Sequence, residues 1–297
     1  MKQRLALAVV LLAAMPAAFA QPPHSHAAAA GHSHEHAGQD TAADQAHAAA
    51  ALAAAVADPR RAPANAARDG WRHPQQTLEF FGVVPHHTVL EVTPGAGWYT
   101  EILAPLLAGH GQYIAAMVDP SSLPEGPGRD YQQRSLDGFN ALVASDGERF
   151  GKVRVNTFAP AAPVFGAPGS VDVVLTFRNV HNWRSNGQEA GYFKAFFDVL
   201  KPGGVLGVVE HRAKADVPAD DKSGYVGVDQ VVALATAAGF VLDASSEVNA
   251  NPADTKDHPD GVWMLPPGNR HPAADAGKYR AIGESDRMTL RFIKPAG

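Results

Sequence analysis

Residues 88–97, Thr-Val-Leu-Glu-Val-Thr-Pro-Gly-Ala-Gly, decide the fold of this chain. Their first half, Thr88–Val92, is an apolar run with β-branched residues, which predicts a buried strand. A turn with two glycines, Gly95 and Gly97, follows at once, and residues 98–107 then repeat apolar side chains at helical spacing. A strand, a glycine turn and a helix in this order are typical of α/β proteins that bind a ligand at the turn.

The same alternation continues to the end of the chain. Further strands are predicted over residues 112–118, 152–158, 170–177, 205–210, 240–246 and 288–293, and further helices over 188–200 and 228–238. The polar residues 121–150 are expected to be helical only in part. This order predicts an α/β domain with a doubly wound, mostly parallel, seven-stranded Rossmann-like sheet. No helix is expected between the last two strands, which predicts an antiparallel hairpin at one edge.

The N-terminus has the pattern of a secretory signal. Lys2 and Arg4 precede an apolar run, Leu5–Met15, and Ala18-Phe19-Ala20 offers small residues where a signal peptidase inspects the chain. A membrane anchor is the weaker alternative, because the run is shorter than the roughly 20 residues that a spanning helix needs. We therefore expect residues 1–20 to be a cleaved signal peptide, the protein to be periplasmic or secreted, and no stable membrane insertion after cleavage.

Residues 21–58 are rich in alanine and histidine and are predicted to be a disordered tail, because they have too few large apolar side chains to offset their ordering entropy. Five histidines are candidate ligands for Zn, Cu or Ni, which neutral imidazoles suit: His24, His26, His32, His34 and His36. A solvated linker that merely contains many histidines is the equal alternative. The folded domain is expected to span residues 59–297.

Composition excludes several classes of function. The 297 residues contain no cysteine, which excludes a thiolate metal site, an iron–sulfur cluster and a cysteine nucleophile. The formal net charge of −5 gives no electrostatic reason to expect a nucleic-acid partner. No nucleic-acid partner is therefore expected, and the oligomeric state stays unknown.

Polar and small residues collect where the predicted strands end, which is where doubly wound sheets bind ligands. Thr93, Gly95 and Gly97 follow the first strand, and Asp119 follows the second, where a carboxylate can accept hydrogen bonds from ribose hydroxyls or simply stabilise a turn. A dinucleotide fingerprint would need glycine where Thr100 stands, which disfavours a nicotinamide cofactor.

The segment after the fourth strand, Arg178-Asn-Val-His-Asn-Trp183, holds the candidate catalytic residues. His181 is a candidate general base, because imidazoles titrate near neutral pH. Trp183 and Tyr99 are expected to wall a pocket, and Asn182 and His211 are weaker candidates for direct roles. A loop histidine bonded to the backbone is the alternative for His181.

Four elements, taken in order, resemble the class I S-adenosylmethionine-dependent methyltransferases. They are the loop 91–97, Asp119, the segment His181-Asn-Trp183, and Leu-Lys-Pro-Gly-Gly at 200–204. The resemblance covers roughly residues 69–297. Three further stretches are similar to a subgroup of exported bacterial predicted methyltransferases: Arg68–Pro74, Pro94–Thr100 and Asn251–Asp254.

This resemblance implies an S-adenosylmethionine site. The methionine end is expected to bind at Glu91, Thr93, Gly95 and Gly97. Asp119 is expected to hold the ribose, and residues near Asn156 and Thr157, after the third strand, are expected to flank the adenine. Arg178 is expected to be a further contact, and Arg72 and His73 are expected to close over the cofactor. The sequence departs from the family where Thr93 replaces a glycine and where Asn156 or Thr157 replaces a carboxylate.

The implied activity is methyl transfer from S-adenosylmethionine to a small-molecule acceptor. The alternative is a non-catalytic periplasmic protein on the same fold that binds a small ligand or a metal. It stays open because the cofactor is made in the cytoplasm, whereas this chain is expected to be exported.

Overall fold

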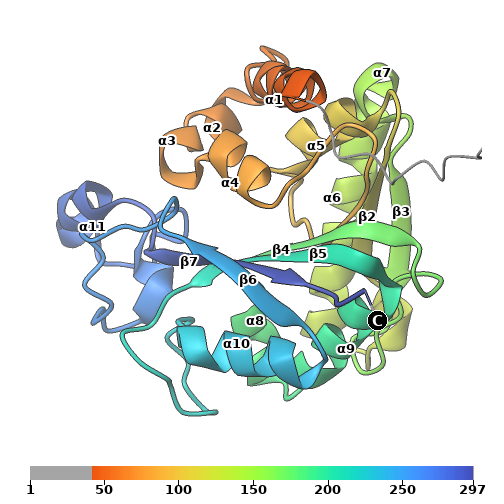
Figure 1. The fold of residues 1–297 in the computed structure, drawn as a ribbon. Coiled ribbons are helices and arrows are strands. Elements are labelled where there is room, and N and C mark those ends of the chain that lie inside the picture. The colour runs from red at the N-terminus through yellow and green to blue at the C-terminus, as the bar shows by residue number, and fades with distance from the viewer. Residues whose placement is uncertain (1–41, 297) are drawn as a thin grey trace, which may run out of the picture. The chain divides into compact units, whose positions relative to one another are not determined.

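The computed structural model describes residues 42–296. The predicted signal peptide and the five candidate metal-binding histidines of the tail lie outside the described residues. The described chain forms one seven-stranded sheet in the order β3-β2-β1-β4-β5-β7-β6, with helices on both faces (Figure 1). No helix within residues 42–296 is long and apolar enough to cross a membrane.

The strands confirm the predicted sheet. Their bounds are β1 Thr88–Val92, β2 Gln112–Val118, β3 Arg154–Phe158, β4 Val171–Phe177, β5 Leu200–His211, β6 Val241–Ser246 and β7 Arg287–Ile293. The first five pair in parallel, and β7 runs antiparallel to both β5 and β6, as the predicted edge hairpin requires. The strand order reverses between β1 and β4, so the carboxyl ends of these two strands mark the topological switch point.

Two layers of helices cover the sheet. One layer consists of α1 Ala42–Val56, α4 Pro74–Phe80, α5 Thr100–Leu107, α6 Pro127–Ser145 and α7 Gly147–Phe150, and the other of α8 Val180–Ser185, α9 Glu189–Val199 and α10 Val228–Ala237. Successive residues of β1 serve opposite layers, since Val89 packs under the first and Leu90 under the second. Burial on both faces explains why β1 is apolar almost throughout.

The shorter elements gather at the carboxyl edge of the sheet. They are α2 Pro63–Ala66, α3 Asp69–Arg72, α11 Ala276–Ile282 and the 3₁₀ turns η1 Pro120–Ser122, η2 Gly261–Met264 and η3 Ala273–Asp275. Residues 247–286 therefore contain helical structure between β6 and β7, where none was expected.

Three further boundaries differ from the prediction. Residues 42–56 form α1, so the predicted tail ends before Ala42 and not at residue 58; Leu52 is only 1% exposed and packs on α4 and α5. The polar residues 127–145 form one continuous helix, whose sole fully buried residue is Phe139. β5 starts already at Leu200, so the glycine pair expected in a preceding turn lies inside the strand.

Leu52→Ala tests whether α1 belongs to the domain. Removing a buried leucine side chain leaves a cavity, so we expect the free energy of unfolding to fall by about 2–4 kcal/mol in chemical denaturation. The exposed neighbour change Gln45→Ala is the matched control, with an expected effect within about 0.5 kcal/mol. Equal, small effects of both changes would show that α1 does not stabilise the domain.

Candidate functional site

The glycine turn lies at the switch point, between the end of β1 and the start of α5. Its backbone is left-handed at Gly95 (φ 61°) and at Gly97 (φ 81°). No atom lies within 4 Å of the place where a Cβ on Gly95 would stand, so this part of the turn is open to a ligand. A side chain on Gly97 would instead collide with Leu142 of α6.

Thr93 also has a left-handed backbone, with a φ of 49°. A β-branched residue in this region is strained, because its Cβ crowds the neighbouring carbonyl. The hydroxyl donates a hydrogen bond of 2.8 Å to the carbonyl oxygen of Val92, which offsets part of that strain. Residue 93 therefore has a backbone conformation that favours glycine, although it carries a threonine side chain.

Glu91 lies in β1, just before the turn, and its carboxylate is bonded to the neighbouring strand β2. Tyr113 donates a hydrogen bond of 2.6 Å to Glu91 Oε2, and the Glu91 residue is only 2% exposed. Burial raises the pKa of the Glu91 carboxyl to about 7, although the Tyr113 hydroxyl and the charge of Arg178 act in the opposite direction. Glu91 is thus bonded to Tyr113, and its contact with the methionine end stays a prediction.

The residues expected at the ribose and adenine take different positions. Asp119 follows β2, and its Oδ1 accepts hydrogen bonds from the backbone N–H and the hydroxyl of Ser121, so this oxygen caps η1. Asn156 and Thr157 were expected after the third strand, but they lie inside β3, paired with residues 116 and 117. Both are exposed and lie close to the carboxyl end of β3, which is Phe158, so their contact with the adenine stays a prediction.

Arginines make the edge beside the glycine turn positive. Glu284 accepts ion pairs from Arg68 at 2.7 Å, Arg72 at 3.1 Å and Arg287 at 3.0 Å. Arg178, with a φ of 63° just after β4, has no ion pair or side-chain hydrogen bond with any residue of 42–296. Burial and the charge of Arg287 lower the pKa of Arg178 to about 10, so its guanidinium is still charged at neutral pH.

Arg72 and His73 join α3 to α4 at this edge. Arg72 is 3% exposed, is paired with Glu284, and stacks over Trp98 with 4.8 Å from guanidinium carbon to ring centroid. Its side chain is thus held by Glu284 and Trp98, and its closing over the cofactor stays a prediction. His73 has a φ of 41°, and its buried Nδ1 has no hydrogen-bond partner within residues 42–296.

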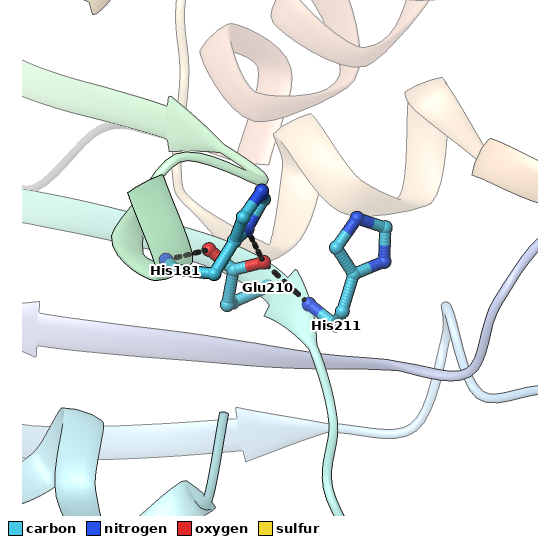
Figure 2. Close-up of side chains that lie close together, drawn as sticks. All are labelled: His181, Glu210 and His211. Atoms are coloured by element: carbon cyan, nitrogen blue, oxygen red, sulfur yellow. Dashed lines mark hydrogen bonds and ion pairs between the residues drawn. The ribbon is translucent and has the colours of Figure 1, made fainter. Parts of the chain in front are cut away.

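His181 and Glu210 form a buried pair at the ends of β4 and β5. His181 Nδ1 lies 3.0 Å from Glu210 Oε1, and the backbone N–H of His181 donates to Glu210 Oε2 at 3.3 Å. Figure 2 shows the carboxylate of Glu210 between His181 and the backbone of His211, which donates to Oε1 at 2.7 Å. A carboxylate on Nδ1 selects the tautomer whose Nε2 is free to accept a proton, and that Nε2 has no partner in the described part of the chain.

The second imidazole of this cluster is held neutral. Burial, together with the charges of His181 and Arg178, keeps the pKa of His211 well below its usual value. Ligand atoms of His181, Glu210 and His211 lie within 4.8 Å of one another, a spacing at which a metal could be bound. The nearby charges of Arg72, Arg178 and Arg287 oppose a divalent cation, and Nδ1 of His211 is already bonded to Ser285. The arrangement therefore suits proton transfer by His181 better than the binding of a divalent cation.

Two predicted wall residues are core residues instead. Trp183 is 4% exposed and stacks on Tyr192 with 4.2 Å between ring centroids. It therefore lies on the buried side of α8, in the core, and does not form a wall of the pocket. Tyr99 is 5% exposed and stacks on Phe177 at 3.7 Å, beside the arginines. Asn182 is exposed and lines a cavity that also touches His181.

The prediction omitted several residues on which this site depends. Glu210 and Glu284 carry the buried negative charges, and neither stands in a motif of its own. The Asn251–Asp254 stretch did carry a signal: Asn251 Nδ2 donates to the carbonyl oxygen of Glu284, and Asp254 accepts from the Tyr225 hydroxyl. This stretch therefore organises the segment that ends at Glu284.

Comparison with known proteins supports the fold. No model of a known protein family and no curated protein matches this sequence. Among solved structures, it is similar to an S-adenosylmethionine-dependent methyltransferase from Aquifex aeolicus, with a TM-score of 0.51, 16% identity, and coverage of 77% of this chain and 93% of the other. It is also similar to the [4+2]-cyclase SpnF, with a TM-score of 0.52, 16% identity, and coverage of 86% and 96%.

At these identities the likeness shows the fold and no more. This chain has the fold of the S-adenosylmethionine-dependent methyltransferases, as its sequence motifs predict. A cyclase is also among the similar structures. The reaction must therefore be argued from the site.

Glu91→Gln should remove a pH dependence of stability. The pKa of Glu91 is about 7 in the folded chain and near 4.5 when unfolded, so the folded state binds the extra proton between these values. Stability is therefore lost as the pH rises from about 4.5 to about 7, by roughly 3 kcal/mol. Urea unfolding at several pH values should show this loss in the wild type and in the exposed control Glu125→Gln, and not in Glu91→Gln. Parallel curves for all three proteins would contradict the assignment.

Thr93→Gly should stabilise the chain. Relief of the left-handed strain is expected to raise the free energy of unfolding by about 1 kcal/mol, net of the lost hydroxyl bond. Thr88→Gly in β1 is the matched control; it should lower stability, because glycine weakens a strand. If both changes lowered the unfolding free energy equally, Thr93 would not be strained.

Proposed function

We propose that this chain is an S-adenosylmethionine-dependent methyltransferase that acts on a small-molecule acceptor. The observation that carries the proposal is the buried His181–Glu210 pair beside the switch point of a methyltransferase fold, in which the buried Nε2 of His181 has no partner within residues 42–296. A general base is what methyl transfer to a hydroxyl or amine requires from the protein, in addition to alignment of the reactants.

The residues at the carboxyl edge suit this cofactor in part. Gly95 leaves backbone room beside the N-terminus of α5, and the guanidinium of Arg178, which has no ion pair within residues 42–296, suits a carboxylate such as that of the methionine end. Asp119 keeps one carboxylate oxygen besides the one that caps η1, which suits a ribose hydroxyl. When bound, S-adenosylmethionine supplies an electrophilic methyl group on sulfur.

His181 accepts the acceptor's proton at Nε2, and Glu210 positions the ring. The negative charge of Glu210 also stabilises the imidazolium that forms, because the pair is shielded from water. The neutral His211 beside it adds no competing charge. These three residues account for base catalysis without a metal ligand.

Export belongs to the same proposal. It is supported by the basic N-terminus, the short apolar run and the small residues at 18–20, which together have the pattern of a cleaved signal. The alternative, a non-catalytic ligand-binding protein on this fold, differs in one respect: it would bind a ligand without turning it over.

Calorimetry with S-adenosylmethionine and with its demethylated product, S-adenosylhomocysteine, tests the proposal. We expect both to bind the wild type, and Arg178→Met to weaken binding about 10- to 100-fold, through loss of a charge-assisted hydrogen bond. His181→Ala should bind both as the wild type does, and its turnover should fall about 10²- to 10⁴-fold, measured as S-adenosylhomocysteine formed with a panel of small hydroxyl and amine compounds.

The exposed change Arg134→Met is the control for Arg178→Met, since it removes the same charge far from the glycine turn. Absence of binding to either nucleoside would refute the methyltransferase proposal. Normal turnover in His181→Ala would refute the role of His181 as the base, but not the methyltransferase proposal.

A further inference from the structure

A cavity of about 250 Å³ lies beside His181. Its walls come from three parts of the chain: α8, the loop 219–225, and the segment 263–270 between β6 and β7. None of the candidate cofactor residues lines it. The cavity thus adjoins the proposed base His181 but is separate from the candidate cofactor residues.

Glycines allow two of these walls to meet. A side chain on Gly224 (φ 78°) would collide with Val262 and Trp263, and one on Gly261 (φ 56°) would strike the backbone of Ser223. The backbone N–H of Val262 donates to the carbonyl oxygen of Ser223 at 2.9 Å, which holds the two segments together. The two glycines and this hydrogen bond therefore hold the segments at 223–224 and 261–263 close together beside the cavity.

The lining of the cavity is positively charged. It contains Arg184, Lys222 and Arg270, and within residues 42–296 none of these three forms an ion pair. Its single carboxylate, on Asp221, accepts hydrogen bonds from the backbone and hydroxyl of Ser223 and so serves a local turn. An anionic group in the cavity would meet three cations and the one carboxylate of Asp221, so the lining has an excess of positive charge.

Aromatic rings, those of His181, Tyr225 and Trp263, form another part of the wall. Trp263 packs edge-on against His181, with 5.4 Å between ring centroids, and Arg270 lies 5.4 Å over the Trp263 ring. The Tyr225 hydroxyl donates its one proton to the carboxylate of Asp254, so it has no donor left for a ligand. Flat apolar walls of this kind favour a planar ligand.

We propose that this cavity binds a single-ring aromatic carboxylate, with the acid toward Arg184, Lys222 and Arg270 and the ring against Trp263. The volume suits such a ligand, because a cavity of about 150 Å³ already holds benzene. That the bound acid is also the methyl acceptor rests on the proposed function; the binding itself does not.

Calorimetry of the full chain with 4-hydroxybenzoate, without S-adenosylmethionine, tests the assignment. We expect 4-hydroxybenzoate to bind at least tenfold more tightly than 4-hydroxybenzamide, which lacks the charge, and than cyclohexanecarboxylate, which lacks the aromatic ring. Equal binding of the acid and the amide would overturn the proposal.

Variants of the cationic lining residues test whether 4-hydroxybenzoate binds in this cavity. Lys222→Gln and Arg270→Gln should each weaken 4-hydroxybenzoate binding about three- to tenfold, a range that allows for screening of exposed charges by solvent. Both positions are exposed, so the fold should be kept, and Arg134→Gln is the control with the same change of charge. If all three variants bound as the wild type does, the cavity would not be the site.

The two proposals fail separately. Selective binding of 4-hydroxybenzoate by a chain that binds neither S-adenosylmethionine nor S-adenosylhomocysteine would support the cavity assignment and refute the methyltransferase. Binding of S-adenosylmethionine without 4-hydroxybenzoate would refute the cavity assignment alone.

Discussion

The carboxylate of Glu284 joins the two ends of the described chain. It accepts ion pairs from Arg68 and Arg72 in the N-terminal helices and from Arg287 at the start of β7. Arg287 also donates a hydrogen bond of 2.6 Å to the carbonyl oxygen of Trp71. Removing one partner of such a buried ionic group costs about 3–5 kcal/mol, because the remaining charges lose their compensation. The carboxyl edge of the sheet therefore depends on this one acid.

The same arginines set the electrostatics of the site. Their charges lower the pKa of His211 and so help to keep it neutral. The charge of Arg287 also lowers the pKa of the neighbouring Arg178, which has no ion pair in the described part of the chain. An edge with this field favours anions over metal cations. On the far side of His181, Arg184, Lys222 and Arg270 repeat that preference. The proposed base thus lies between two regions that both favour negatively charged ligands.

Local sequence pattern was enough to predict most of the sheet. The bounds of β1 and β2 agree with the prediction to the residue, because a strand buried on both faces is a short apolar run between turn residues. Helices were predicted less completely than strands. α1 is mostly alanine, so its sequence has no apolar stripe, and α6, which was expected to be helical only in part, surrounds its core-facing residues Leu136, Phe139 and Leu142 with polar ones. Leu52, buried against α5, is a contact that no local window reveals.

The sequence by itself determined where the site lies, since the carboxyl ends of parallel strands share one edge and the residues that follow them must gather there. It placed the glycine turn, Asp119, Arg178 and His181 at that edge. Only the tertiary structure decided which side chains face it. Strand pairing turned Glu91 toward Tyr113, the start of α8 sent Trp183 into the core, and the parallel register of β4 with β5 brought Glu210 to His181. These directions depend on neighbours far away in the chain, and a one-residue change of register would reverse them.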